Sequence, residues 1–87
     1  MELDPTEMTP VINRIKRAQG RLASVLRLLE EGPDCEDVVT QLAAVSKALD
    51  RAGFAIVASG LQQCLAEGDG VDSVDVKKME KLFLSLA

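Results

Sequence analysis

The chain contains one amphipathic helical pattern that is too long for a compact molecule of its size. Asp34 can cap the start of this helix, and Asp37 follows three residues later as in a capping box. Apolar residues then recur at helical spacing to about Leu65, at Val38, Leu42, Val45, Leu49, Ile56 and Leu61. About 31 helical residues span roughly 46 Å, whereas a compact chain of this length has a radius of gyration of about 12 Å. The pattern therefore predicts that the helix projects from its own subunit and that its apolar side is buried by self-association.

Two shorter helical patterns flank the long one. Thr9 and Pro10 are suited to the start of the first, whose apolar residues continue until Gly32-Pro33. Asp72 or Ser73 can start the last one, after the Gly68-Asp69-Gly70 stretch. The sequence lacks repeats and strand-like alternation. We therefore predict an all-α, three-helix protomer in a single domain over residues 1–87, with residues 1–8 as a flexible segment.

The composition excludes several classes of protein. The chain has no apolar run long enough to span a membrane, and its acidic start lacks the features of a signal peptide. We therefore expect a cytoplasmic protein, in which the two cysteines are normally reduced. There is no histidine, so one chain cannot supply the four soft ligands of a structural zinc site. We expect no cofactor.

The net charge of −4 conceals a strongly basic segment in the first helix. Residues 14–27 carry five basic side chains and no acid. Arg14, Arg17 and Arg21 recur at helical spacing and so form a continuous cationic surface of the kind that binds phosphates. The alternative is a solvated face that pairs with acids of a neighbouring helix or subunit. Because the chain lacks tyrosine and tryptophan, binding to nucleic acid would use the backbone and grooves of a duplex.

The two cysteines, Cys35 and Cys64, lie at opposite ends of the long predicted helix. Their separation of 29 residues corresponds to roughly 43 Å, so they cannot touch within one subunit. At about 100° per residue, both thiols nevertheless lie on one stripe of the helix. An antiparallel partner helix would bring Cys35 of one subunit to Cys64 of the other. The alternative is that both cysteines are inert and pack as small apolar side chains.

The run INRIKRAQGRLASVLRLLEEGPDCEDVVTQLAAVSKALDRAG, continuing to Cys64, resembles the family of small bacterial repressors that includes CsoR, RcnR, FrmR and CstR. The tail DVKKMEKLFLSLA resembles the short third helix of that family. The resemblance implies an antiparallel dimer, a dimer-of-dimers tetramer, and operator DNA that is released when an inducer modifies a site between subunits.

The inducer is indicated by the residues on the cysteine stripe. Copper-sensing members carry a Cys, His, Cys arrangement, and the matching positions here are Cys35, Gly60 and Cys64. Glycine offers no side-chain ligand, although two thiolates can still bind copper(I) linearly. Nickel and cobalt sensors use several histidines, and formaldehyde sensors use the first cysteine with other nucleophiles. A site with two cysteines and no histidine resembles CstR, the branch that responds to persulfides.

That resemblance implies a sulfur-transfer reaction between subunits. The dipole of the long helix favours a thiolate at Cys35 and disfavours one at Cys64, although Asp34, Glu36 and Asp37 oppose the first effect. We expect Cys35 to take sulfur from a persulfide or polysulfide donor. Cys64 of the partner subunit then attacks, which leaves a disulfide or a longer sulfur bridge.

The resemblance also implicates two arginines in DNA binding, Arg14 and Arg51. Helical periodicity adds Arg17, Arg21 and Lys47 to this set. Glu80 matches an acid that connects the third helix to the sensor site in copper-responsive members. An enzymatic role has little support because no histidine or CxxC motif accompanies the cysteines. A purely structural helical bundle that does not bind DNA is the remaining alternative.

Overall fold

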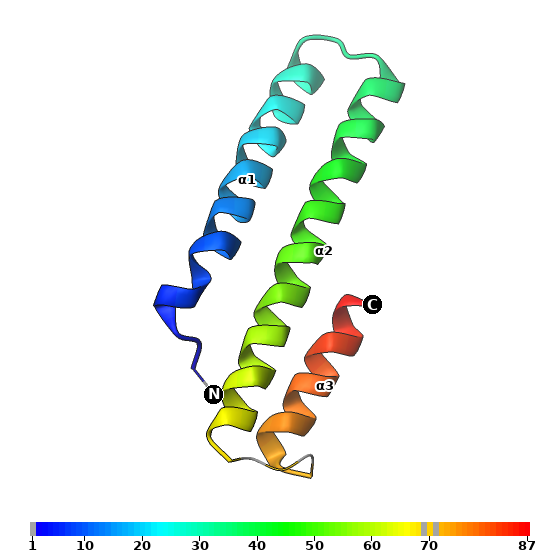
Figure 1. The fold of residues 1–87 in the computed structure, drawn as a ribbon. Coiled ribbons are helices and arrows are strands. Elements are labelled where there is room, and N and C mark those ends of the chain that lie inside the picture. Colours follow the sequence, from blue (N-terminus) through cyan, green and yellow to red (C-terminus); the bar gives the residue numbers. More distant parts are fainter. Residues whose placement is uncertain (1, 69, 71) are drawn as a thin grey trace.

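The computed structural model describes residues 2–68, 70 and 72–87, and these residues form three α-helices (Figure 1). The helices are α1 (Thr9–Glu30), α2 (Cys35–Ala66) and α3 (Val74–Leu86), and a short 3-10 helix, η1 (Pro5–Met8), precedes α1. The described residues include no strand, which confirms the all-α prediction. Asp69, part of the predicted break before the last helix, lies outside the described residues, as does Met1.

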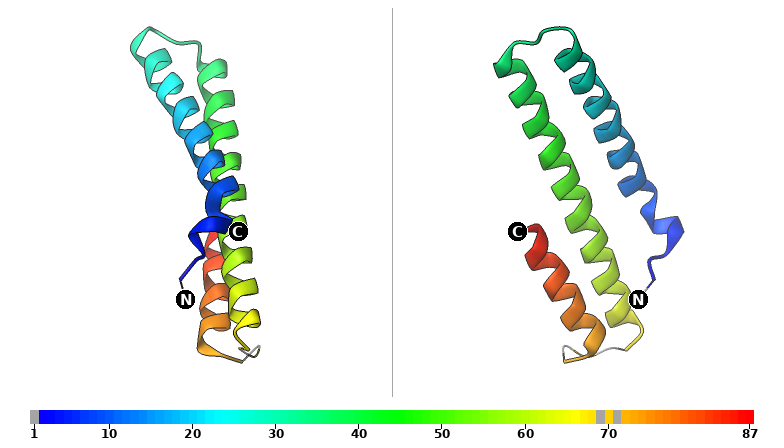
Figure 2. Two further views of the ribbon diagram at one scale, coloured as in Figure 1. Left: turned by 60° about the vertical axis from the view of Figure 1, so that its left-hand side comes forward. Right: turned by 180° about the vertical axis from the view of Figure 1, so that it is seen from behind.

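The three helices form an elongated arrangement and not a compact one. Helices α1 and α2 make a long antiparallel hairpin, and α3 folds back along the C-terminal half of α2, on the side away from α1 (Figures 1 and 2). The molecule measures 54 × 25 × 13 Å, with a radius of gyration of 16.7 Å. A compact chain of this length would have a radius of about 12 Å. The long helix therefore extends through the whole molecule. The prediction that it projects from its own subunit is wrong, because α1 and α3 together lie alongside its length (Figure 1).

Capping side chains set the start of two helices. The Asp34 carboxylate accepts a hydrogen bond from the Asp37 amide at 3.3 Å, and the Ser73 hydroxyl accepts one from the Val76 amide at 3.1 Å. The cap at Asp34 was predicted from the sequence, and Ser73 is one of the two residues, Asp72 or Ser73, predicted to start the last helix. The predicted cap at Thr9 is wrong, because η1 runs directly into α1 and Thr9 already has helical φ and ψ values of −52° and −47°. Asp4 takes the capping position instead, at the start of η1.

The core is a narrow seam between α1 and α2. Its buried residues are small and recur every seven positions, as Val11, Ala18 and Val25 on α1 and Val38, Val45 and Ala52 on α2. Larger apolar side chains lie outside the seam and remain partly exposed, among them Ile15, Leu22, Leu26, Leu29, Leu42 and Leu49. The hairpin therefore has an apolar side that the protomer itself does not cover.

Two glycines of α2 allow α3 to lie close to it. A Cβ at Gly53 would lie 2.9 Å from a methyl carbon of Leu86, and one at Gly60 would lie 2.8 Å from Met79 Sδ. The rings of Phe54 and Phe83 also meet, with their centroids 5.3 Å apart. Within the protomer, the missing side chain at Gly53 therefore allows α3 to approach α2 closely.

None of the helices in the described ranges is long and apolar enough to cross a membrane.

Candidate functional site

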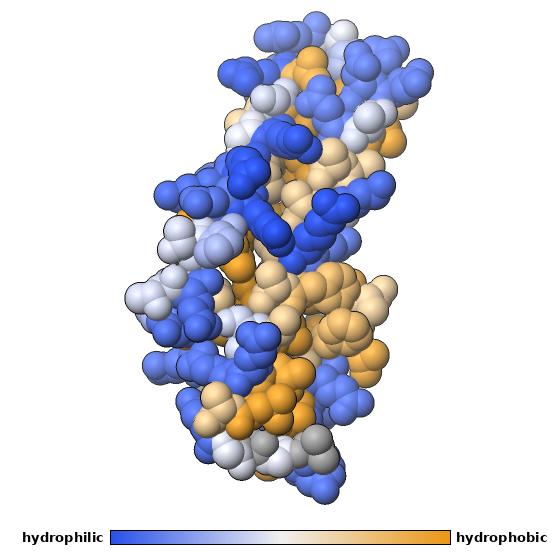
Figure 3. Space-filling view, viewed as in Figure 1, coloured by the Kyte–Doolittle hydropathy of each residue, from blue (hydrophilic) through white to orange (hydrophobic). Residues whose placement is uncertain are grey.

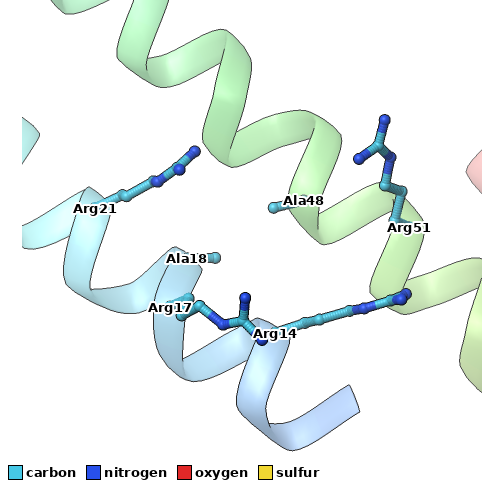
Figure 4. A pocket seen from close by; sticks show the side chains of 6 residues that line it. All are labelled: Arg14, Arg17, Ala18, Arg21, Ala48 and Arg51. Carbon is cyan, nitrogen blue, oxygen red and sulfur yellow. The ribbon is translucent and has the colours of Figure 1, made fainter. Parts of the chain in front are cut away.

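Four arginines gather in a groove between α1 and α2. Arg14, Arg17 and Arg21 come from α1 and Arg51 from α2, and the floor is formed by Ala18 and Ala48 (Figure 4). The groove has a volume of about 270 Å³. Arg14 reaches across it toward the helix that carries Arg51 (Figure 4). The two alanines leave room for the arginine side chains to converge above the seam.

The charge of these arginines is not neutralised within the protomer. Across residues 2–68, 70 and 72–87, none of the four guanidinium groups makes an ion pair or a hydrogen bond with another side chain. Arg27, further along α1, differs because it donates a hydrogen bond to the Ser24 hydroxyl at 3.1 Å. Hydrophilic side chains dominate this part of the surface (Figure 3). The groove therefore presents a concentrated positive charge with donors available to an anion.

Lys47 is the one predicted DNA-binding residue that does not line the groove. It lies on α2, one helical turn before Arg51, and its side chain is exposed. It adds positive charge beside the groove. Glu80 lines a separate apolar groove between α2 and α3, of about 500 Å³, together with Phe54, Leu61 and Phe83 among others.

A second groove between α1 and α2 is apolar. It has a volume of about 280 Å³ and is lined by Ile15, Ala18, Gln19, Leu22, Val45 and Leu49. Ala18 lines both this groove and the arginine groove, so the two grooves flank the same buried seam. The hairpin therefore presents a basic surface on one side of the seam and an apolar surface on the other.

The two cysteines lie in different environments on α2. Cys35 is the first residue of the helix and is exposed, whereas Cys64 lies near its other end and is only 2% exposed. The helix is continuous between them, so the separation of roughly 43 Å excludes a bond within one protomer. No group of three potential His, Cys, Asp or Glu metal ligands occurs in the described part of the chain. Any reaction that joins the two thiols must therefore take place between subunits.

Gly60 lies one helical turn before Cys64, and α3 fills the space beside it. Met79 is buried, with 7% exposure, and its sulfur packs directly on the Gly60 backbone. Helical periodicity in the sequence gives no sign of this contact. The Leu3 side chain also lies beside Gly60, because its Cδ2 atom would be 3.8 Å from a Cβ at that position.

The N-terminal residues are held against the same turn of α2. The Asp4 amide donates a hydrogen bond to Gln63 Oε1 at 3.2 Å, and the Ser59 hydroxyl donates one to Glu7 Oε2 at 3.5 Å. Hydrogen bonds from the Thr6 hydroxyl and the Thr6 amide lower the pKa of the Asp4 carboxyl below its ordinary value of 3.8. The predicted flexibility of residues 1–8 stays a prediction.

Comparison with known proteins identifies relatives of several kinds. The chain is 35% identical over 68 residues to a copper-sensing transcriptional repressor CsoR of Mycobacterium ulcerans, covering 74% of this chain and 58% of that protein. It is 32% identical over 69 residues to the copper-sensing transcriptional repressor RicR of Mycobacterium tuberculosis, covering 77% of this chain and 72% of that protein. It is also 50% identical over 40 residues to the uncharacterized protein YrkD of Bacillus subtilis, covering 46% of this chain and 64% of that protein.

The chain thus spans less than two thirds of the length of the CsoR and YrkD relatives. No solved structure matches it significantly. The sequence model of the family described as metal-sensitive transcriptional repressors matches residues 7–85, which include α1, α2, all but the last residue of α3, both cysteines and every arginine of the basic groove. The chain therefore belongs to the family of metal-sensitive transcriptional repressors.

Proposed function

We propose that this protein is a cytoplasmic transcriptional repressor that binds operator DNA and releases it when reactive sulfur species bridge Cys35 to Cys64 of a partner subunit. The observation that carries DNA binding is the groove formed by Arg14, Arg17, Arg21 and Arg51. Four guanidinium groups without acidic partners in the described chain match the phosphates of a DNA duplex. Lys47 extends this positive surface along α2.

A homodimer, and a tetramer built from two dimers, complete the proposed functional unit. Support comes from the apolar groove with Leu22 and Leu49, which lies across the seam from the arginines. A second copy packed on the apolar side buries these residues and leaves the arginines open to DNA. Antiparallel pairing of two α2 helices also brings Cys35 of one subunit to Cys64 of the other, because both residues occupy the same stripe of the helix.

The proposed reaction proceeds in two steps that balance in atoms and electrons. The Cys35 thiolate takes the sulfane sulfur of a persulfide donor RSSH, which forms a Cys35 persulfide and releases RSH. The partner's thiol at position 64 then attacks the Cys35 sulfur atom, and H₂S leaves as the intersubunit disulfide forms. Over both steps the two thiols together lose two electrons and two protons, and the sulfane sulfur of the donor is reduced to H₂S. The bridge fixes two α2 helices at a new separation, which changes the spacing of the arginines.

Copper(I) is the second candidate inducer, because the CsoR and RicR relatives are named as copper-sensing. Two cysteine thiolates from different subunits can bind copper(I) in a linear geometry. The absence of histidine from the sequence and the close packing of Met79 on Gly60 favour the sulfur reaction, because no imidazole can complete a trigonal site. Formaldehyde and other electrophiles that react at Cys35 remain alternative inducers.

Fluorescence anisotropy with labelled DNA from the protein's own promoter region tests both parts of this proposal. We expect binding that weakens steeply with salt and is lost after treatment with polysulfide. Intact mass should then show a covalent dimer that Cys35→Ser and Cys64→Ser each abolish. Absence of salt-sensitive DNA binding contradicts the repressor function. Release by copper(I) or formaldehyde but not by polysulfide contradicts the proposed inducer.

A further inference from the structure

The N-terminal segment crosses the turn of α2 that precedes Cys64. We call residues 3–7 the N-terminal strap. The Asp4 amide in the strap bonds to Gln63, the residue next to Cys64, and Glu7 accepts a bond from Ser59. The Leu3 side chain forms one wall of a small apolar pocket of about 170 Å³, whose other lining residues are Ile56, Val57, Gly60, Met79 and Leu82. The strap therefore covers the α2 surface beside Cys64.

Helix α3 covers the other side of the same turn, but it is held more firmly. Three contacts spread over the length of α3 attach it to α2. They are Met79 on Gly60, Leu86 on Gly53 and Phe83 against Phe54. The strap is held by two side-chain hydrogen bonds of 3.2 and 3.5 Å and by the one apolar side chain of Leu3. Elements with few buried contacts open at the lowest free-energy cost. Access to the buried Cys64 is therefore easiest where the strap lifts.

The strap also carries negative charge. Glu2 directly precedes it, and Asp4 and Glu7 lie within it, with no basic residue among positions 2–8. The pocket beneath the strap is apolar apart from the backbone. A negatively charged reagent meets repulsion at the strap and loses hydration in the pocket, whereas a small uncharged reagent meets neither cost. Cys35 has no comparable cover, because it is exposed at the first position of α2.

We propose that the N-terminal strap is a specificity-determining cover of Cys64, which admits small uncharged electrophiles and excludes anionic ones. Leu3 closes the apolar pocket and Gln63 holds the strap in place. If the proposed function holds, the cover also sets the order in which the two cysteines react. The exposed Cys35 reacts with the sulfur donor first, and Cys64 reacts when the strap lifts.

The test measures thiol modification alone, so its result is independent of DNA binding and of reactive sulfur. Full-length protein with Cys35→Ser, in which Cys64 is the only thiol, is treated with methyl methanethiosulfonate or with its anionic sulfonatoethyl analogue. The Cys64 thiolate attacks the sulfenyl sulfur, an S–S bond forms as the S–SO₂ bond breaks, methanesulfinate leaves, and the thiol proton passes to solvent. Intact mass follows both rates. The same protein unfolded in urea gives the reference ratio of the two reagents at an uncovered Cys64. Cys35 is not used as the reference, because Asp34, Glu36 and Asp37 repel an anionic reagent there.

We expect the anionic reagent to be disfavoured at Cys64 relative to that reference. Gln63→Ala, which removes the acceptor for the Asp4 amide, should accelerate the anionic reagent about fivefold, the ratio that corresponds to one net hydrogen bond. Leu3→Ala should accelerate it similarly by opening the pocket. Gln62→Ala, at an exposed neighbouring position, and Leu84→Ala, on the exposed side of α3, are the matched controls and should leave both rates unchanged.

Two results overturn the proposal. One is a reagent ratio at Cys64 of the folded protein that equals the ratio in the urea-unfolded protein. The other is a rate in Gln63→Ala and Leu3→Ala that does not differ from the rate in the two controls. Circular dichroism of each variant establishes that its helices are intact, and the urea-unfolded protein gives the rate of a fully uncovered Cys64.

Discussion

Met79 Sδ packs so closely on Gly60 that a Cβ added at Gly60 would lie 2.8 Å from the sulfur. Gly20, in the interior of α1, is the opposite case, because a Cβ there would have no atom within 4 Å. Both glycines are helical, and both therefore carry the entropic cost of glycine in a helix. Comparing the same substitution at the two glycines therefore measures the effect of the contact between α3 and α2 beside Cys64.

We predict that Gly20→Ala stabilises the protein by about 0.5–1 kcal/mol, because alanine has the higher helix propensity and meets open space. Gly60→Ala should show no such gain, since Met79 must move to make room and strained packing costs about 1–3 kcal/mol. Urea unfolding at a fixed protein concentration measures both. Equal stabilisation by the two substitutions would show that Met79 does not restrict position 60.

The second prediction concerns the arginine groove. Arg51→Ala should weaken operator binding and should also lower the slope of log affinity against log salt by about 0.9, the value for one phosphate contact on duplex DNA. Arg27→Ala is the matched control on α1, because Arg27 bonds to Ser24 and lies outside the groove. Anisotropy at several salt concentrations gives both quantities. The same loss in both variants would indicate a general charge effect and no specific groove.

The third prediction concerns the start of α3. Ser73→Ala removes the side-chain acceptor of the Val76 amide and should destabilise the protein by about 1 kcal/mol. Ser85→Ala removes a hydroxyl near the other end of the helix, which donates to the Leu82 carbonyl from an exposed position, and should change stability by less than about 0.5 kcal/mol. Urea unfolding of the two variants provides the comparison. A larger effect at Ser85 would contradict the assignment of Ser73 as the cap.

The fourth prediction concerns the acid titration of Asp4. Its folded-state pKa is lowered, first by the hydrogen bond from the Thr6 hydroxyl and then by that from the Thr6 amide, so the carboxylate stabilises the strap above its unfolded pKa. That contribution is lost as pH falls through the folded pKa. Carbon NMR of the Asp4 carboxyl should give a midpoint below 3.8, and Thr6→Ala should raise it. Thr9→Ala, which removes a hydroxyl with no bond to Asp4 in the described chain, should leave the midpoint unchanged.

Much of the fold could be predicted because it depends on local patterns. The spacing of apolar residues, together with Asp34 and Ser73 as caps, indicated the three helices before any tertiary contact was considered. The grouping of Arg14, Arg17 and Arg21 on one side of α1 followed from helical periodicity in the same way. Arg51 could be placed beside them only through the family resemblance, because periodicity within one helix does not reveal which residues of another helix face it.

The contacts around Gly60 could not be predicted, because they join segments that are distant in the sequence. Nothing in the local pattern of the last helix distinguishes Met79 from its apolar neighbours, and nothing near the N-terminus indicates that Asp4 meets Gln63 across 59 positions. The error at Thr9 has a different cause. A capping residue followed by proline occurs twice near the N-terminus, at Asp4-Pro5 and at Thr9-Pro10, and the helical residues begin after the first pair, in η1.

Ala18 has a consequence for how the two surfaces of the hairpin influence each other. This one methyl group borders both the arginine groove and the apolar groove, and it is only 2% exposed. A larger side chain there, or a partner that wedges between α1 and α2 on the apolar side, must separate the helices at this level. The distance between Arg14 and Arg51 then changes as well. A change on the apolar side of the hairpin is therefore coupled directly to the arginine groove on the other side, and no rearrangement along the length of the helices is needed.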